Sequence, residues 1–300
     1  IRDNDCHGIW IDNQWQHSRI TRNVIVNNLW SGINMELGRG PCLIDNNVIA
    51  ATRQGDGIYG HDVADITIAH NLIYANANFG VWFAYATLRV KPEDGCWDIR
   101  TLNNMILGNR AGAVAYPMPW ECAGNNRSEG NLFMGGGEYL DEGSGPTAPL
   151  FQLANRTHGG PDAPVKVPMT RENALKLFVS RLDSAGITPE KRPNLDQWSE
   201  DRLVNFDIWR AAMGNDTTSR VMRVIRDGLH SRLVSWECDI DSVILQVRCD
   251  PVTGVERDFM GTAFPRGNIM PGPFQKLDVG LRNRCVLWPV RGIGSPWILE

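Results

Sequence analysis

The sequence predicts a right-handed parallel β-helix, with a mixed helical segment in the C-terminal half of the 300-residue chain. Two independent repeats with one period support this fold class. Glycines that open short alternating phrases recur at intervals of 24, 25, 23 and 32 residues, at Gly8, Gly32, Gly57, Gly80 and Gly112. Asparagines that precede short apolar runs recur at intervals of 24, 24, 33 and 27 residues, at Asn23, Asn47, Asn71, Asn104 and Asn131.

Other repeat architectures do not fit this pattern. Helical solenoids have longer units with apolar residues spaced by three and four, and leucine-rich repeats carry a leucine-and-asparagine signature that is missing here. In a parallel β-helix, by contrast, like residues stack above like. We therefore expect the asparagines to form an inward hydrogen-bonded ladder at a repeated bend, and the glycines to form turns.

The repeat loosens after about residue 140, where helical spacing begins. Three helices are predicted, over Thr170–Gly186, Ser199–Met213 and Ser219–Leu229, and the first of them places four apolar residues on one face: Leu175, Phe178, Val179 and Leu182. The later run SVILQV predicts a strand, and GTAFPRGNIMPGPF predicts loops. The expected division is coils carrying an active site over residues 1–149, a helical insertion or accessory segment over 150–235, and C-terminal strands and loops over 236–300 that pack back on the coils.

Composition limits the classes of partner. A net charge of −4 argues against nucleic acid, and no apolar run reaches the roughly 20 residues that span a bilayer. The seven scattered cysteines contain no CxxC pair, so we expect isolated thiols and neither a metal site nor another cofactor. Because the chain opens on Ile1, we expect a fragment or processed form. The sequence leaves open whether the protein is secreted, periplasmic or cytoplasmic, and it leaves the oligomeric state open as well.

Strand alternation predicts which residues of each coil face outward. In GIWID, Ile9 and Ile11 are expected to point inward, which leaves the residues between and after them outside. Applied to the next coils, this rule predicts two neighbouring outward columns. One reads Asp12, Glu36 and His61, and the other reads Trp10, Asn34, Tyr59 and Trp82.

Asp12 and Glu36 lie one 24-residue coil apart, so their strands are expected to be neighbours about 4.8 Å apart. Retaining glycosidases use two carboxyl groups about 5–5.5 Å apart, and like charges this close favour a proton on one of them. Acidic residues on exposed strands are also often merely solvated, but the aromatic column favours a sugar site. His61 either contacts the ligand or pairs with Asp62, and Trp10 and Trp82 alternatively pack beneath a loop.

The segments GIWIDNQ, RITRNVIVNN and NMELGRGPCLIDNNVI resemble glycoside hydrolase family 120, the β-xylosidase family built on a right-handed parallel β-helix. Weaker likeness continues in ITIAHNLI, TLNNMILGN, SEGNLFMGG, FPRGN and PGPF. The resemblance implies that Asp12 is the nucleophile and Glu36 the acid/base. One departure is Arg39, in GRGP, where the family commonly has histidine, and this change puts the substrate preference in doubt.

The leading hypothesis is a cofactor-free retaining glycosidase acting on xylo-oligosaccharides or a related glycan. Trp10, Tyr59 and Trp82 would shape the cleft, Arg39 and His61 would bind hydroxyl groups, and Asn34 would be a further substrate-binding residue. A polysaccharide lyase on the same scaffold is the second hypothesis, kept open by the basic Arg39 beside Glu36. A non-catalytic carbohydrate-binding β-helix is the third, because it needs the aromatic column but not the acids.

Overall fold

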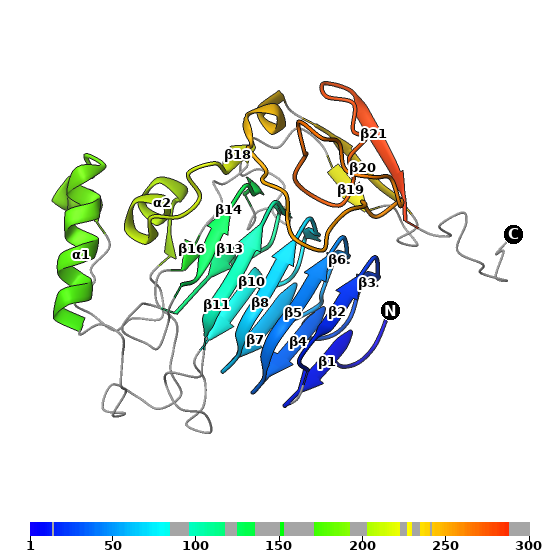
Figure 1. The fold of residues 1–300 in the computed structure, drawn as a ribbon, viewed down its shortest axis with the longest axis horizontal. Helices are drawn as coiled ribbons and strands as arrows, with labels where there is room; N and C mark the ends of the chain where they lie inside the picture. The colour runs from blue at the N-terminus through cyan, green and yellow to red at the C-terminus, as the bar shows by residue number, and fades with distance from the viewer. Residues whose placement is uncertain are drawn as a thin grey trace, which may run out of the picture.

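The structure is a computed structural model that describes residues 1–13, 15–84, 96–117, 125–135, 151–152, 171–192, 203–222, 227–229, 235–240 and 242–287. Its main body is a parallel β-helix, as predicted: successive coils stack side by side and contribute one strand to each of three sheets (Figure 1). The interior is filled by isoleucine, valine and phenylalanine side chains that are fully buried. Burial of these aligned apolar columns is the main stabilising term of the stack.

Each sheet collects the corresponding strand of every coil. The first sheet contains, in spatial order, β1 (Ile9–Asp12), β4 (Ile33–Glu36), β7 (Ile58–His61), β10 (Phe79–Ala84), β13 (Gly112–Ala115), β16 (Phe151–Gln152) and β17 (Leu203–Val204). The second sheet contains β2 (Ser18–Thr21), β5 (Arg39–Asp45), β8 (Ala64–Ala69), β11 (Trp97–Leu102) and β14 (Arg127–Glu129). The third sheet contains β3 (Val24–Val26), β6 (Val48–Ala50), β9 (Leu72–Tyr74), β12 (Met105–Leu107), β15 (Leu132–Met134) and β18 (Arg220–Met222).

The predicted asparagine ladder is confirmed at the tight bend between the second and third sheets. The Nδ2 of each asparagine donates to the Oδ1 of the next at 3.0 or 3.1 Å, through Asn23, Asn47, Asn71, Asn104 and Asn131. The residue before each ladder asparagine has a positive φ, for example 53° at Asn46 and 66° at Gly130. This left-handed residue makes the two-residue bend and turns the amide inward.

A second ladder, which was not predicted from the sequence, stabilises the bend between the third and first sheets. Asn4 Nδ2 donates to Asn28 Oδ1 at 2.8 Å, and Asn76 Nδ2 donates to Asn109 Oδ1 at 2.8 Å. Thr52 takes the intermediate position and donates its backbone N–H to Asn76 Oδ1 at 3.3 Å. Because one coil carries threonine here, the repeat is less regular in sequence than the first ladder.

The repeated glycines stand where the chain enters the first sheet. An added Cβ on Gly32 would lie 2.4 Å from Ile49 Cγ2, and one on Gly57 would lie 2.5 Å from Ile73 Cγ2. Neither glycine has a positive φ, so neither needs left-handed backbone. These positions require glycine because the interior leaves room for a hydrogen only.

The helical segment lies at the end of the stack opposite β1 (Figure 1). The first predicted helix is confirmed as α1 (Arg171–Ser184), although Thr170 lies outside the described residues. Its Phe178 and Leu182 are buried as predicted, but Val179 is 40% exposed. The second is shorter than predicted, as α2 (Phe206–Met213), because Asn205 caps its N-terminus and accepts a hydrogen bond from Ile208 N–H at 3.0 Å.

Two predictions for the remaining chain are wrong. The described parts of this range, residues 219–222 and 227–229, contain strands instead of a helix: β18 pairs with β15 in parallel and extends the third sheet, and β19 (Asp227–Leu229) joins a small antiparallel sheet with β20 (Ser235–Asp239) and β21 (Arg282–Val286). The run SVILQV forms a 3-10 helix, Ser242–Gln246, rather than a strand. In both cases contacts distant in sequence outweigh local propensity.

The C-terminal segment covers the outer face of the third sheet. Trp236, Phe259 and Phe274 pack there in one cluster with residues such as Met105 and Leu132. The predicted loop 261–274 contributes to this cover and holds no strand or helix. The candidate site residues lie on the other two sheets.

Candidate active site

The strand register aligns the two predicted outward columns across the first sheet. Asp12 on β1 pairs with Glu36 on β4, which pairs with His61 on β7. We call these three residues the acidic row. In the neighbouring column Trp10 pairs with Asn34, Asn34 with Tyr59, and Tyr59 with Trp82, and we call these four the aromatic row.

The alternating residues confirm which face is outside. Ile33 and Met35 on β4, Ile58 on β7 and Val81 on β10 are fully buried in the interior. The acidic and aromatic rows alternate with them, and because side chains alternate along a strand they project from the opposite face. Asp12 is exposed at the outer strand β1, whereas Glu36 is only 17% exposed.

The Glu36 carboxylate is held by two neighbours within the rows. Asn34 Nδ2 donates to Glu36 Oε1 at 3.1 Å, and His61 Nε2 lies 3.4 Å from the same oxygen. Asn34 is only 1% exposed, so it contacts the carboxylate rather than solvent. These contacts fix the orientation of Glu36 on a rigid sheet.

His61 is itself held from the other side. Its Nδ1 lies 3.0 Å from Asp62 Oδ2, and both side chains are buried. The predicted alternative of a pair with Asp62 is thus confirmed, but in a buried setting rather than at the surface. Asp62, His61 and Glu36 form a continuous carboxylate–imidazole–carboxylate chain. In this chain Asp62 favours a proton on Nδ1 and leaves Nε2 to face Glu36.

The aromatic row is exposed at one end and closed at the other. Trp10 is 56% exposed beside Asp12, while Tyr59 and Trp82 are half-buried and meet edge to face with ring centroids 5.5 Å apart. The predicted packing of Trp10 beneath a loop does not occur among the described residues. Burial raises the pKa of the Tyr59 hydroxyl, so Tyr59 offers a neutral O–H.

Two further aromatic residues next to the rows were missed from the sequence. The His7 ring lies 5.7 Å from Trp10 and 5.2 Å from Trp30, which is 46% exposed. Burial lowers the pKa of His7, against the opposing effect of the Glu36 charge. His7 precedes the repeated Gly8 and Trp30 precedes Gly32 by two residues, so the glycine register was the signal that could have located them.

Arg39 is the one predicted site residue outside the first sheet. It begins β5, beyond the corner that follows Glu36, and is exposed. Its Cα pairs with Ala64 in the second sheet rather than with a member of either row. Arg39 therefore stands at the edge of the site, one corner away from the carboxylates.

Within the described ranges, no group of three or more His, Cys, Asp and Glu side chains is arranged to hold a metal ion. Five of the cysteines in the described ranges are free thiols, namely Cys6, Cys42, Cys96, Cys249 and Cys285. None of the helices in the described part of the chain is long and apolar enough to cross a membrane.

Comparison with known proteins identifies the fold but no activity or substrate. Residues 7–137 match the family described as right handed beta helix region, which is the part of the chain that carries the coils and both rows. The predicted right-handed parallel β-helix is thereby confirmed. The curated proteins and the solved structures gave no match to this chain.

Proposed function

We propose that this protein is a retaining glycoside hydrolase, similar to β-xylosidases, that cleaves xylo-oligosaccharides or a related glycan at the acidic row. The observation that carries the proposal is the in-register pairing of Asp12 and Glu36 on adjacent parallel strands. Neighbouring strands are about 4.8 Å apart, which suits the separation of about 5–5.5 Å between the carboxyl groups of retaining enzymes. Inverting enzymes need about 6.5–9.5 Å to admit a water molecule.

In this mechanism Asp12 attacks the anomeric carbon and Glu36 protonates the leaving oxygen. Glu36 then removes a proton from the water that hydrolyses the covalent intermediate. The acid/base must therefore change its protonation state twice in each turnover. The contact of Glu36 with His61 Nε2 supports this role, because an imidazole whose Nδ1 proton points at Asp62 presents the Nε2 lone pair, which accepts a hydrogen bond from the protonated Glu36 carboxyl.

In this proposal the aromatic row contacts the substrate. Exposed Trp10 stands directly beside Asp12, where an indole face suits the apolar face of a sugar ring. Tyr59 and Trp82 continue the surface along the stack, so a chain of sugars would run parallel to the axis of the β-helix. Asn34 and His61 both contact Glu36, so in this proposal they also hold the acid/base in position. The resemblance to glycoside hydrolase family 120 supports the xylosidase assignment.

The test compares three alanine variants on nitrophenyl β-xyloside and on xylo-oligosaccharides. Asp12→Ala should abolish turnover of both. Glu36→Ala should retain more activity on the nitrophenyl substrate, because nitrophenolate leaves without a proton, and added azide should rescue its rate and give a product with the substrate's anomeric configuration. Glu172→Ala, which removes an exposed carboxylate on α1, is the matched control and should behave as the unmodified protein.

Three outcomes would contradict the proposal. A first-formed product of inverted configuration would make Asp12 a base that activates water. An unsaturated product that absorbs in the ultraviolet would identify a lyase. Glycan that is bound but stays intact, with equal behaviour of all variants, would identify a non-catalytic binding protein.

A further inference from the structure

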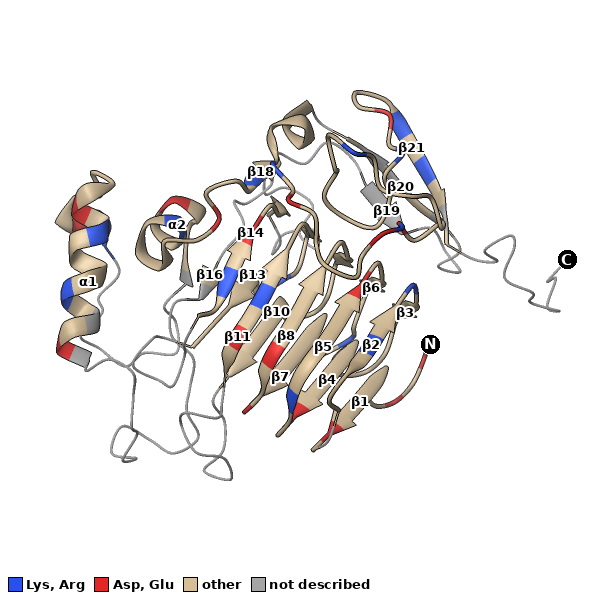
Figure 2. Ribbon diagram, viewed as in Figure 1, with Lys and Arg blue, Asp and Glu red and all other residues tan. Residues whose placement is uncertain are grey.

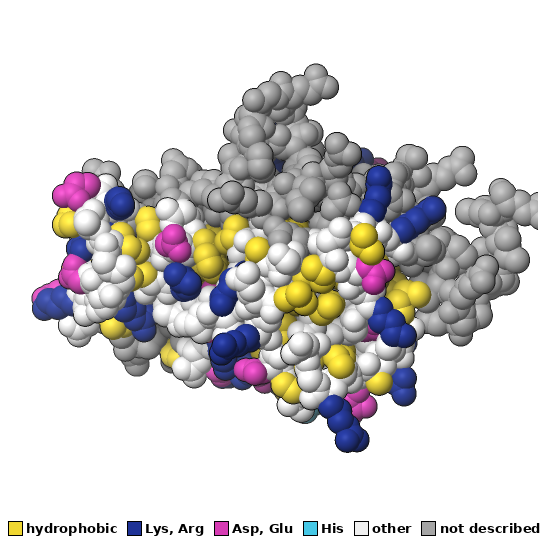
Figure 3. All heavy atoms as spheres, turned by 90° about the horizontal axis from the view of Figure 1, so that it is seen from above, with side chains coloured by type: hydrophobic (Ala, Val, Ile, Leu, Met, Phe, Trp, Pro, Cys, Tyr) yellow, Lys and Arg dark blue, Asp and Glu magenta, His cyan; other side chains and the backbone are white. Residues whose placement is uncertain are grey.

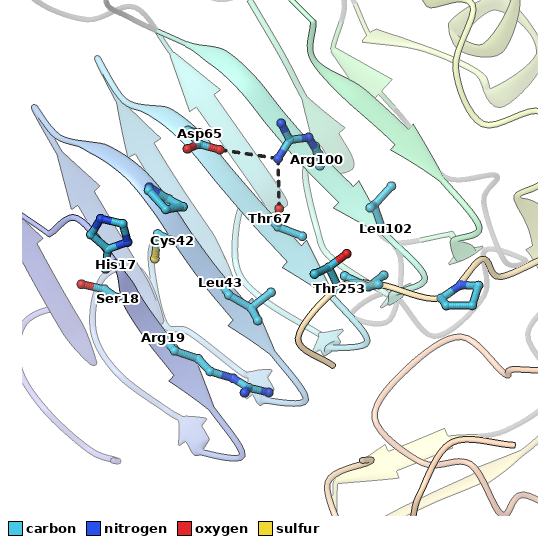
Figure 4. A pocket seen from close by; sticks show the side chains of 13 residues that line it. His17, Ser18, Arg19, Cys42, Leu43, Asp65, Thr67, Arg100, Leu102 and Thr253 are labelled. Carbon is cyan, nitrogen blue, oxygen red and sulfur yellow. Dashed lines mark hydrogen bonds and ion pairs between the residues drawn. The ribbon is translucent and has the colours of Figure 1, made fainter. Parts of the chain in front are cut away.

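The outer face of the second sheet carries a groove of about 610 Å³, distinct from the acidic row on the first sheet (Figure 4). Its floor is formed by four adjacent strands, β2, β5, β8 and β11. Residues 251–253 of the C-terminal segment form one wall, with Thr253 above the floor in Figure 4. A volume of this size lies within the range of small-molecule sites, about 300–1,000 Å³.

The floor is one register row that runs along the axis of the stack. Arg19 pairs with Leu43, Leu43 with Thr67, and Thr67 with Arg100. Three strand spacings separate the two arginines, which is about 14 Å at 4.8 Å per spacing. The row therefore presents hydrogen-bond donors at both ends and an apolar and a hydroxyl side chain between them.

The charges of the groove are compensated locally. Arg19 donates two hydrogen bonds of 2.8 Å to Asp45, which is fully buried. Arg100 Nη1 lies 3.5 Å from Asp65 Oδ1 and 3.5 Å from Thr67 Oγ1, and its side chain is 40% exposed. Figure 2 shows acidic and basic positions side by side on this sheet, and Figure 3 shows both signs interspersed on another face of the molecule. Nothing in the described groove draws an anion in particular.

Hydrogen-bonding capacity nevertheless remains at the Arg100 end. Contacts of 3.5 Å are weak, and a guanidinium carries five N–H donors. Asp65 is also about one-third exposed, at 36%. An exposed guanidinium and carboxylate at this distance match the vicinal hydroxyl groups of a sugar, which both donate and accept. Leu43 and Leu102 supply apolar surface for the sugar ring.

The wall of the groove is anchored to the stack. Asn103, in the bend after β11, donates from Nδ2 to the backbone oxygen of Asp250 at 2.8 Å. The Cys249 thiol lies 3.4 Å from the backbone oxygen of Gly130. Because floor and wall are both fixed, a ligand would lose little binding energy to ordering the site.

We propose that this groove binds a short segment of a neutral oligosaccharide, laid along the axis of the β-helix. It would act as a secondary carbohydrate site on a different face from the acidic row. Arg100, Asp65 and Thr67 bind the hydroxyl groups, and Leu43 contacts the ring. An acidic glycan is disfavoured because both arginines already have carboxylate partners.

The test is methyl NMR of the whole chain, titrated separately with xylohexaose, cellohexaose, mannohexaose and, as the acidic probe, an oligogalacturonide. Saturable shifts of the Leu43, Leu102 and Val252 methyl resonances with at least one neutral probe are expected. Perturbation confined to methyl groups near Asp12 and Glu36, or none with any neutral probe, would overturn the inference. So would groove shifts caused by the oligogalacturonide alone. Shifts at the groove with none near the acidic row would weaken the proposed function and leave the groove site intact.

Two variants test the residues. Arg100→Ala should weaken binding of the neutral oligosaccharide to the groove about tenfold or more, since hydrogen bonds to charged groups contribute most to affinity. Arg127→Ala, on the neighbouring strand β14 and in the same register row but outside the groove lining, is the matched control and should leave binding unchanged. Thr253→Trp, which fills the groove from an exposed position, should block binding without removing a floor contact. Unchanged binding in both groove variants would refute the proposal.

Discussion

Replacement of Asn47 by alanine tests the architecture on which every site argument depends. Asn47 is fully buried in the ladder and its side chain makes four hydrogen bonds. It accepts from Asn23 N–H at 3.0 Å and from Asn23 Nδ2 at 3.1 Å, and donates to Ile20 O at 2.9 Å and to Asn71 Oδ1 at 3.0 Å. A net hydrogen bond contributes about 1 kcal/mol, so Asn47→Ala should lower the free energy of unfolding by about 4 kcal/mol.

Asn23→Ala is the control, because Asn23 is the first rung of the ladder in this chain. Its Nδ2 makes two hydrogen bonds, to Thr21 O at 3.0 Å and to Asn47 Oδ1 at 3.1 Å, and Asn23 is only half-buried. The expected loss is therefore about 2 kcal/mol. Urea denaturation followed by circular dichroism measures both variants. Equal losses, or a loss below about 1 kcal/mol for Asn47→Ala, would refute the reasoning that the rungs stabilise by their hydrogen bonds.

Three further predictions concern single side chains. Trp10→Ala should raise KM for glycan and leave the melting temperature unchanged, because Trp10 is 56% exposed; a lower melting temperature with unchanged KM would make it a packing residue. Asp62→Asn should lower kcat about tenfold with little change in KM, since it loosens the His61 ring; steady-state kinetics would contradict this if KM changed alone. Burial raises the pKa of Asp56 to about 8, against 3.8 ordinarily, so the folded protein holds a proton that the unfolded chain releases. The free energy of unfolding should fall as the pH rises from about 4 to about 8, and Asp56→Asn should flatten that slope in urea titrations, whereas an unchanged slope would exclude Asp56 as its source.

The coil architecture was predictable because its signal is periodic. Asn23, Asn47 and Asn71 recur at one spacing, and each ladder hydrogen bond among these three joins two asparagines that are 24 residues apart. The pairing of Asp12 with Glu36 followed from the same period, since a column in a stacked sheet is a fixed offset in sequence. Neither inference required knowledge of what covers the sheet.

The rest depended on contacts that no period encodes. Strand alternation placed Asn34 and His61 outward, but it did not show that both side chains are buried against Glu36. Residues 219–229 have apolar spacing typical of a helix, yet Arg220 pairs with Leu132 and adds a strand to the third sheet. The two segments are 88 residues apart in sequence, and they also meet where Ser219 Oγ accepts a hydrogen bond from the backbone N–H of Asn131 at 2.8 Å. A local sequence pattern carries no information about pairing between segments so far apart.

The stacked coils separate the residues that hold the fold from those to which we assign chemistry. Inward positions are repeated from coil to coil, as with Ile33 and Ile58, because each must pack on its counterpart. Outward positions in the same strands differ, as Asp12, Glu36 and His61 do, because no neighbour in the stack requires them to match. A substitution of an exposed outward residue such as Trp10 should therefore change activity at little cost in stability, whereas a substitution in an inward column or a ladder should mainly lower stability. The same separation allows two faces of one stack, the first and second sheets, to carry independent sites.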